Sequence, residues 1–131
     1  MPDVLLDTNI LIFHLRGHQK VMALLLEFSQ AGDLFISAIT RTEILAGMRL
    51  HEETDTLALL NSLLTLPLDS PIADKAGRLI YRYARQGQQL SFADALIGAT
   101  ALEHHLTLVT TNARHFPMPD LSLHLVQQSD L

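Results

Sequence analysis

The chain has 131 residues, of which 48% are apolar, and it carries a formal net charge of −5. This composition predicts one globular domain over residues 1–131, and the acidic balance excludes a protein that grips nucleic acid mainly through a basic surface. The absence of cysteine excludes disulfides, thiolate metal sites and cysteine nucleophiles, and no apolar stretch suits a signal peptide or a membrane span. We therefore expect a soluble, cytoplasmic protein with no membrane partner.

Short apolar runs alternate with helical segments along the chain. The first run begins at Val4 and leads into Asp7, where we expect the strand to end because Thr8 and Asn9 favour the start of a helix. Further strands are predicted at residues 34–37, 66–68, 106–110 and 123–126, and helices at residues 10–15, 19–31, 40–50, 51–64, 72–85 and 91–104. This alternation predicts a three-layer α/β/α sandwich with a mainly parallel central sheet.

Three helix starts carry recognisable capping signals. Thr40 and Glu43 have the spacing of a capping box, and Ser91 with Asp94 is a close relative of that pattern. Ser70 is followed by proline, which is typical of the first helical position. On spacing alone, Glu43 and Asp94 could do no more than begin their helices, and Asp7 could simply cap the turn after its strand.

A second interpretation gives the same acids a chemical role. Asp7, Glu43 and Asp94 each stand where a strand or loop passes into a helix, and such points can gather at one end of a parallel sheet. Carboxylates are the hard oxygen ligands that Mg²⁺ and Mn²⁺ prefer, and several of them would repel one another without a cation. This interpretation predicts a divalent metal that activates water and stabilises a phosphoryl transition state.

Other site types find little support. The seven histidines form no HExxH pattern, and neither GxGxxG nor GxxxxGK[ST] is present. A histidine metal site and nucleotide binding through a glycine-rich loop are therefore not expected.

Four segments together resemble the PIN domains, and within them the VapC-type toxins of bacterial toxin–antitoxin pairs. The segments are Asp7-Thr8-Asn9 after an apolar strand, Ser37 to Gly47 around Glu43, Phe92 to Ala101 around Asp94, and Leu108 to Phe116. They follow the order of the family's motifs and extend over essentially the whole chain.

The resemblance implies a metal-dependent ribonuclease. In such proteins the carboxylates that match Asp7, Glu43 and Asp94 bind Mg²⁺ or Mn²⁺ and position water for attack on an RNA phosphodiester. The side chains that match Thr8, Asn9 and Thr110 are expected to hold this site in place. Proteins of this kind form homodimers and are silenced by a cognate antitoxin, so we expect a toxin–antitoxin hetero-oligomer as well.

The fourth motif departs from the family at Asn112, where an Asp is frequent. Asn112 can still offer a carbonyl oxygen or orient water in catalysis, but it removes one negative charge and favours a single strong metal site. His115 could approach this site or pack in the loop beside Phe116. For RNA, Arg41 and Arg49 are the expected phosphate contacts, and the alternative set on one helix face is Arg78, Arg82 and Arg85.

Competing hypotheses remain. A phospho-acceptor signalling module of the flavodoxin type also uses a carboxylate at a strand end, but it requires a lysine late in the chain. The only lysines of this sequence are Lys20 and Lys75, and neither is at the end of a late strand. A dehalogenase-type phosphatase requires the motif DxDxT. Here the residue two positions after Asp7 is Asn9 and not an aspartate. A PIN-like protein that has lost activity and only binds RNA or a partner stays open because of Asn112.

Overall fold

Five short strands form one sheet in which every neighbouring pair is parallel. The computed structural model describes residues 2–127. The strands are β1 (Val4–Leu6), β2 (Leu34–Ser37), β3 (Leu64–Leu66), β4 (Thr107–Thr110) and β5 (Leu123–Leu125), in the order β3-β2-β1-β4-β5. The first strand of the chain is therefore the central one, flanked by β2 and β4.

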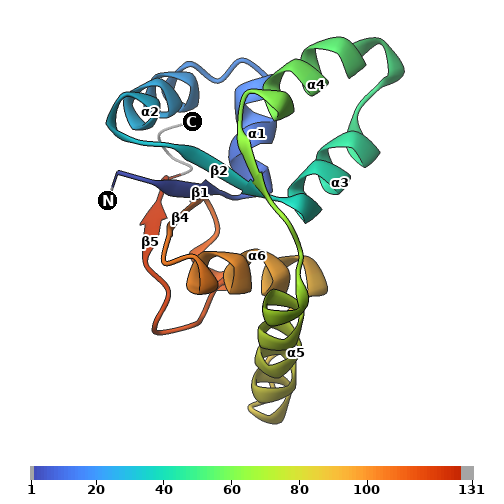
Figure 1. The fold of residues 1–131 in the computed structure, drawn as a ribbon, viewed down its shortest axis with the longest axis vertical. Helices are drawn as coiled ribbons and strands as arrows, with labels where there is room; N and C mark the ends of the chain where they lie inside the picture. The colour runs from blue at the N-terminus through green and yellow to red at the C-terminus, as the bar shows by residue number, and fades with distance from the viewer. Residues whose placement is uncertain (1, 128–131) are drawn as a thin grey trace.

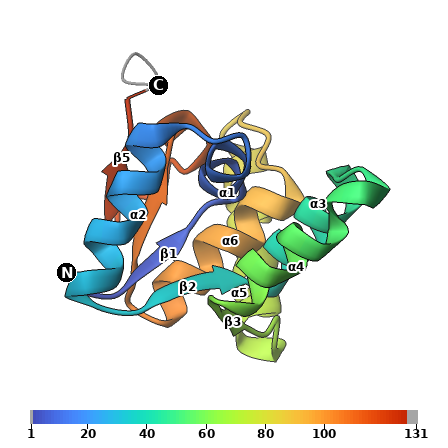
Figure 2. The same ribbon diagram turned by 90° about the horizontal axis from the view of Figure 1, so that it is seen from above.

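Helices cover both faces of this sheet. They are α1 (Thr8–Leu15), α2 (Gln19–Ala31), α3 (Ala38–Gly47), α4 (Glu53–Asn61), α5 (Ser70–Arg85) and α6 (Phe92–Glu103), with short 3₁₀ turns η1 (Leu50–Glu52) and η2 (Ala113–His115). Figures 1 and 2 show that α1, α2, α3 and α4 cover one side of the sheet. The other side is covered by α5 and α6. The predicted three-layer α/β/α sandwich is confirmed.

Alternate residues of the strands supply two separate cores, because successive side chains of a strand point to opposite faces. Leu5 and Leu108 pack with buried residues of α5 and α6. Val4, Leu6 and Val109 pack with buried residues of α1 to α4. Burial on both faces explains why β1 is continuously apolar. Within residues 2–127 we find no helix with the length and apolar character needed to cross a membrane.

Several predicted boundaries are wrong for local reasons. The helix expected from Thr40 begins at Ala38 instead, because the hydroxyl of Ser37 accepts a hydrogen bond from the Ile39 N–H. The cap of α5 is Asp69 rather than Ser70, since its carboxylate accepts from the Ile72 N–H. The first helix starts at Thr8, two residues early, because Asp7 is its cap.

The region around residues 51–68 also differs from the prediction. The expected helix over residues 51–64 is divided into η1 and α4, and α4 ends at Asn61 because Ser62 turns back with its hydroxyl donating to the Leu59 carbonyl. The third strand then occupies Leu64–Leu66 rather than residues 66–68. Pro67 has no N–H to donate to a sheet, which fits its place after the strand.

Three helices end in the same hydrogen-bonded turn, in which the residue after the cap takes a left-handed conformation. Gly17 after α1 and Gly87 after α5 supply this conformation with φ near +78° and +77°. After α6 the same place is taken by His105 at φ 55°, with the Leu106 N–H donating to the Ala101 carbonyl at 2.9 Å. A side chain is disfavoured there because Cβ approaches the following carbonyl oxygen.

Replacing His105 by glycine is therefore expected to stabilise the fold. Relief of the left-handed strain, less the extra freedom that glycine has in the unfolded chain, amounts to roughly 0.5–1 kcal/mol. The midpoint of thermal unfolding should rise by about 2–4 °C, as measured by circular dichroism. His104→Gly is the matched control, since His104 has φ −96° and should lose stability. A midpoint for His105→Gly at or below wild type would show that the left-handed conformation of residue 105 does not cost stability.

Candidate active site

The carboxyl ends of three neighbouring strands form the candidate site. Because β1, β2 and β4 are adjacent and parallel, Asp7, the Ser37 turn into α3 and Thr110 meet at the same edge of the sheet. Such an edge is where ligands bind in open α/β sheets. The predicted gathering of strand-to-helix junctions is thus present for β1 and β2, and β4 adds its own end to them.

Asp7 is the buried centre of this edge, with 5% of its surface exposed. Its Oδ1 accepts from the Thr8 N–H at 2.8 Å, and its Oδ2 accepts from the Thr110 hydroxyl at 2.7 Å. Burial raises the pKa of Asp7 above its ordinary value of 3.8. The two hydrogen bonds oppose this shift, and the nearby charges of Asp94 and Glu43 add to it. Thr8 lies between Asp7 and Glu43, since its N–H donates to the first carboxylate and its hydroxyl to the second.

Glu43 is joined to the site through two threonines. The Thr8 hydroxyl donates to Glu43 Oε1 at 2.7 Å and lies 3.0 Å from the Thr40 hydroxyl. A hydroxyl has one proton, so Thr40 must donate to Thr8 when Thr8 donates to Glu43. Thr40, fully buried, is therefore not a helix cap but the first member of a hydrogen-bonded chain that ends at the carboxylate. The capping-box interpretation of Thr40 and Glu43 is wrong.

Asp94 faces the site from the first turn of α6. Its N–H donates to the Ser91 hydroxyl at 3.1 Å, which confirms Ser91 as the cap of that helix. Its side chain is mostly buried, with 22% exposed, and Asp94 Oδ2 lies 3.4 Å from His115 Nδ1. Of the two positions considered for His115, the one near the site is therefore the one observed.

The remaining predicted residues differ in how closely they join the cluster. The Asn112 N–H donates to the Thr110 hydroxyl at 3.0 Å, so Asn112 follows directly on the group that holds Asp7. Asn9 is half-buried in α1 and takes no part in the hydrogen bonds that link Asp7, Thr8 and Glu43. Thr40 is not predicted from the sequence as a partner of Thr8, because the one available signal is a hydroxyl three residues before Glu43.

The side chain of Arg41 links secondary-structure elements through hydrogen bonds. Its guanidinium donates to the Leu60 carbonyl and the Thr65 hydroxyl, each at 3.3 Å, and to Asn61 Oδ1 at 3.0 Å. These bonds connect α3 to the end of α4 and to β3. Arg49 is exposed just beyond the end of α3.

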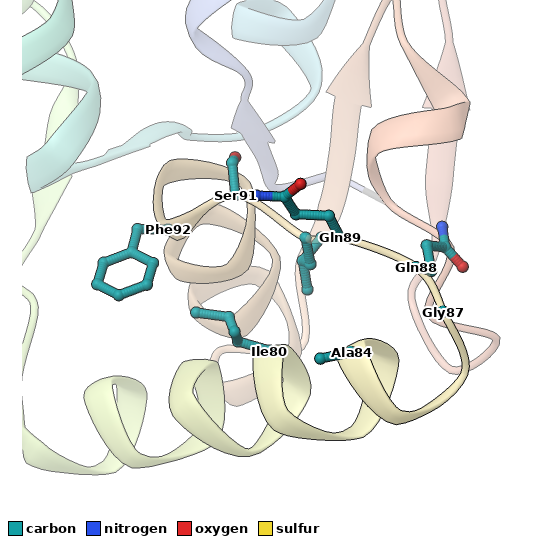
Figure 3. Close-up of a pocket in the computed structure, with 8 residues that line it drawn as sticks. Ile80, Ala84, Gly87, Gln88, Gln89, Ser91 and Phe92 are labelled. Atoms are coloured by element: carbon teal, nitrogen blue, oxygen red, sulfur yellow. The ribbon is translucent and has the colours of Figure 1, made fainter.

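A groove of about 730 Å³ lies beside this site rather than in it. It is bounded by the second half of α5 and the segment leading into α6 (Figure 3), and its lining includes Ile80, Leu90 and Phe92 but none of the three acids. Phe92 is 74% exposed at its mouth. The apolar lining of this groove suits contact with another protein surface better than binding of a charged phosphate.

Three carboxylates at one sheet edge form a donor set of the kind that hard divalent cations prefer. Burial is the main cause of the raised pKa of Asp7, and the negative charges of Asp94 and Glu43 add to it. As the side chains stand, no three Asp, Glu or His residues within 2–127 are grouped closely enough to hold a metal ion. The donor chemistry fits a cation, whereas a formed coordination sphere is not present.

Asp7→Asn is expected to stabilise the protein near neutral pH in the presence of a chelator. A carboxyl whose pKa is higher in the folded than in the unfolded chain costs stability once the pH exceeds both values, so removing the charge recovers that loss. The unfolding midpoint should be a few degrees above wild type at pH 7–8. The difference should shrink as the pH falls toward 3.8, because the wild-type carboxyl becomes protonated.

Thermal unfolding followed by circular dichroism across this pH range measures the effect. Asp120→Asn, at an exposed position, is the matched control and should change the midpoint little at any pH. An Asp7→Asn midpoint below wild type at neutral pH would show that burial does not dominate at this carboxyl.

The sequence and the fold both match known proteins. Residues 4–119 match the family model of the PIN domain. Two curated relatives from Mycobacterium tuberculosis are ribonuclease VapC19, 39% identical over 89% of this chain and 95% of the relative, and ribonuclease VapC10, 37% identical over 88% and 86%. A toxin–antitoxin complex from Klebsiella pneumoniae superimposes with a TM-score of 0.75 at 29% identity, over 94% of this chain and 99% of the other. This chain therefore belongs to the PIN-domain family, and within it to the VapC type.

Proposed function

We propose that this protein is a metal-dependent endoribonuclease and the toxin of a toxin–antitoxin pair. The observation that carries the proposal is the gathering of Asp7, Glu43 and Asp94 at the carboxyl edge of a PIN fold, with the pKa of buried Asp7 raised. Relatives that are 37% and 39% identical are named ribonucleases, which supports RNA as the substrate. A phospho-acceptor module is not favoured, because the whole fold matches the PIN domain.

Asp7, Glu43 and Asp94 are the residues that would hold Mg²⁺ or Mn²⁺. When bound, the cation would supply an activated water and stabilise the negative charge that develops at phosphorus. Hydrolysis would then form a bond from the water oxygen to phosphorus and break a bridging P–O bond of the RNA chain. Asn112 contributes an uncharged amide where a fourth acid is frequent, which favours one cation over two.

The other polar residues of the site keep the ligands in place. Thr110 donates to Asp7 Oδ2 and the Thr8 N–H donates to Asp7 Oδ1, so each carboxylate oxygen has one donor and keeps further acceptor capacity for a cation. Thr8, itself held by Thr40, fixes Glu43 Oε1. Through these bonds, the carboxylate of Asp7 before α1 and that of Glu43 in α3 are oriented by the protein's own donors.

The proposed partners are an antitoxin and a second copy of this chain. A solved structure with this fold is titled a toxin–antitoxin complex, which supports the first. Surface for such contacts exists on α2, where Met22 and Leu26 are 44% and 61% exposed, while Val21 and Leu25 are core residues. The groove beside exposed Phe92 offers apolar surface for a homodimer. The proposed site of action is the cytoplasm.

The nuclease proposal is tested by comparing wild type with Asp7→Asn. Expressed without an antitoxin, the wild type should arrest growth and degrade cellular RNA, and the purified protein should cleave RNA with Mg²⁺ or Mn²⁺ but not with a chelator. Asp7→Asn should abolish both effects, because it removes the central carboxylate. Asp74→Asn, exposed on α5, should behave as wild type. Intact RNA and unaffected growth with the wild-type protein would refute the proposal.

Arg41 and Arg49 are proposed phosphate contacts, and charge reversal separates this role from a structural one. Arg49→Glu should lower RNA cleavage severalfold without changing the unfolding midpoint, because the side chain is exposed. Arg41→Glu should also lower the midpoint, since three hydrogen bonds are lost. Arg78→Glu on the exposed face of α5 is the comparison, expected to retain cleavage. If Arg78→Glu is impaired and Arg49→Glu is not, the RNA path runs along α5 instead.

A further inference from the structure

The segment from Thr110 to Met118 crosses the carboxyl edge of the sheet and is fixed at both ends. At its start, the Thr110 hydroxyl donates to Asp7 Oδ2 and accepts from the Asn112 N–H. We call this segment the β4 strap. Its first residue therefore depends directly on the buried carboxylate at the end of the central strand.

At its other end, the β4 strap is seated on α6. Phe116 and Met118 are buried, with 2% and 5% exposed. Both side chains lie over Gly98, where an added Cβ would stand 2.8 Å from Met118 Cε and 3.7 Å from Phe116 Cδ1. Gly98 follows Asp94 by one helical turn, so the two residues share one side of α6. The place where the β4 strap packs on α6 is thus on the same side of the helix as Asp94.

His115 stands between these two anchors. The turn η2 fixes its backbone, because its N–H donates to the Asn112 carbonyl at 3.1 Å and the next N–H donates to the Ala113 carbonyl at 3.1 Å. Its Nδ1 lies 3.4 Å from Asp94 Oδ2, while 55% of its side chain remains exposed. The contact spans 21 residues of sequence, and the strap alone brings it about.

We propose that His115 is a positioning residue for Asp94: Nδ1 of the strapped histidine holds the Asp94 carboxylate at the cluster that Asp7 and Glu43 form. Three neighbouring carboxylates repel one another, and an N–H donor behind one of them offsets that repulsion. The Nδ1–Oδ2 distance of 3.4 Å is that of a polar contact longer than a typical hydrogen bond, and either the neutral Nδ1–H tautomer or the protonated ring can present a proton to the carboxylate there. The inference rests on the proposed function in taking Asp94 as a ligand of the cation.

Titration calorimetry with Mn²⁺ on the intact protein tests this role without relying on catalysis. His115→Ala should weaken Mn²⁺ binding roughly tenfold, as expected when a partner behind a metal ligand is lost. His115→Asn should bind close to wild type, because its amide N–H₂ reaches the place of Nδ1. His115→Gln should resemble the alanine variant, because its longer side chain carries the amide to the place of Nε2 instead.

Two further variants define the comparison. Arg114→Ala changes the neighbouring exposed residue of the same turn and should leave Mn²⁺ affinity unchanged. Asp94→Asn removes the carboxylate itself and should weaken binding at least as much as His115→Ala. Since His115 is largely exposed, thermal unfolding of each His115 variant without metal should match wild type, which separates a positioning effect from a folding defect.

Each outcome decides the proposal. Unchanged Mn²⁺ affinity in His115→Ala would overturn it. Wild-type affinity in His115→Gln but not in His115→Asn would also overturn it, because the effect would then come from Nε2 and a contact outside the protein, such as RNA. If Asp94→Asn binds Mn²⁺ normally while wild type cleaves RNA, the inference fails and the nuclease proposal stands. If wild type neither binds Mn²⁺ nor cleaves RNA, both fail.

Discussion

The carboxylate of Asp7 is buried at the end of the central strand, where two hydrogen-bond donors replace the water that it has lost. This arrangement is costly, because burial disfavours the charged form more than the donors favour it, and the pKa rises. The other residues at this edge of the sheet are arranged around the Asp7 carboxylate. Thr8 begins a helix at it, Thr110 ends a strand at it, and the acids of α3 and α6 lie close enough to raise its energy further.

This cost has a plain relation to function. A site optimised for stability alone would pair Asp7 with a basic side chain or replace it by an amide, whereas the groups that hydrogen-bond to Asp7 are the Thr8 N–H and the Thr110 hydroxyl. Uncompensated negative charge beside ordered hydroxyls is what a divalent cation would neutralise. Asp7 also caps α1, so its carboxylate combines a structural role with a raised pKa at one edge of an otherwise apolar sheet.

The architecture could be predicted from local patterns, since strand and helix periodicities and the cap at Ser91 are properties of short stretches. Errors arose where two residues competed for one role. Ser37 and Thr40 both suit a helix start, and only the path of β2 into α3 decides for Ser37, which frees Thr40 to meet Thr8. The contacts Thr8–Glu43 and His115–Asp94 depend on the order of strands and on a loop packed against α6. No spacing rule encodes such contacts, so the residues were predicted while their partners were not.

The hydrogen bond between Thr110 and Asp7 joins residues 103 positions apart, and it closes the site from opposite ends of the chain. Neither β1 nor the helices of the first half can form this edge alone, because β1 gains its second neighbour only when β4 is in place. During synthesis, the site therefore stays incomplete until β4 has been made and has paired with β1. A chain that ends before β4 carries Asp7 and Glu43 but lacks the neighbouring strand that completes their edge of the sheet.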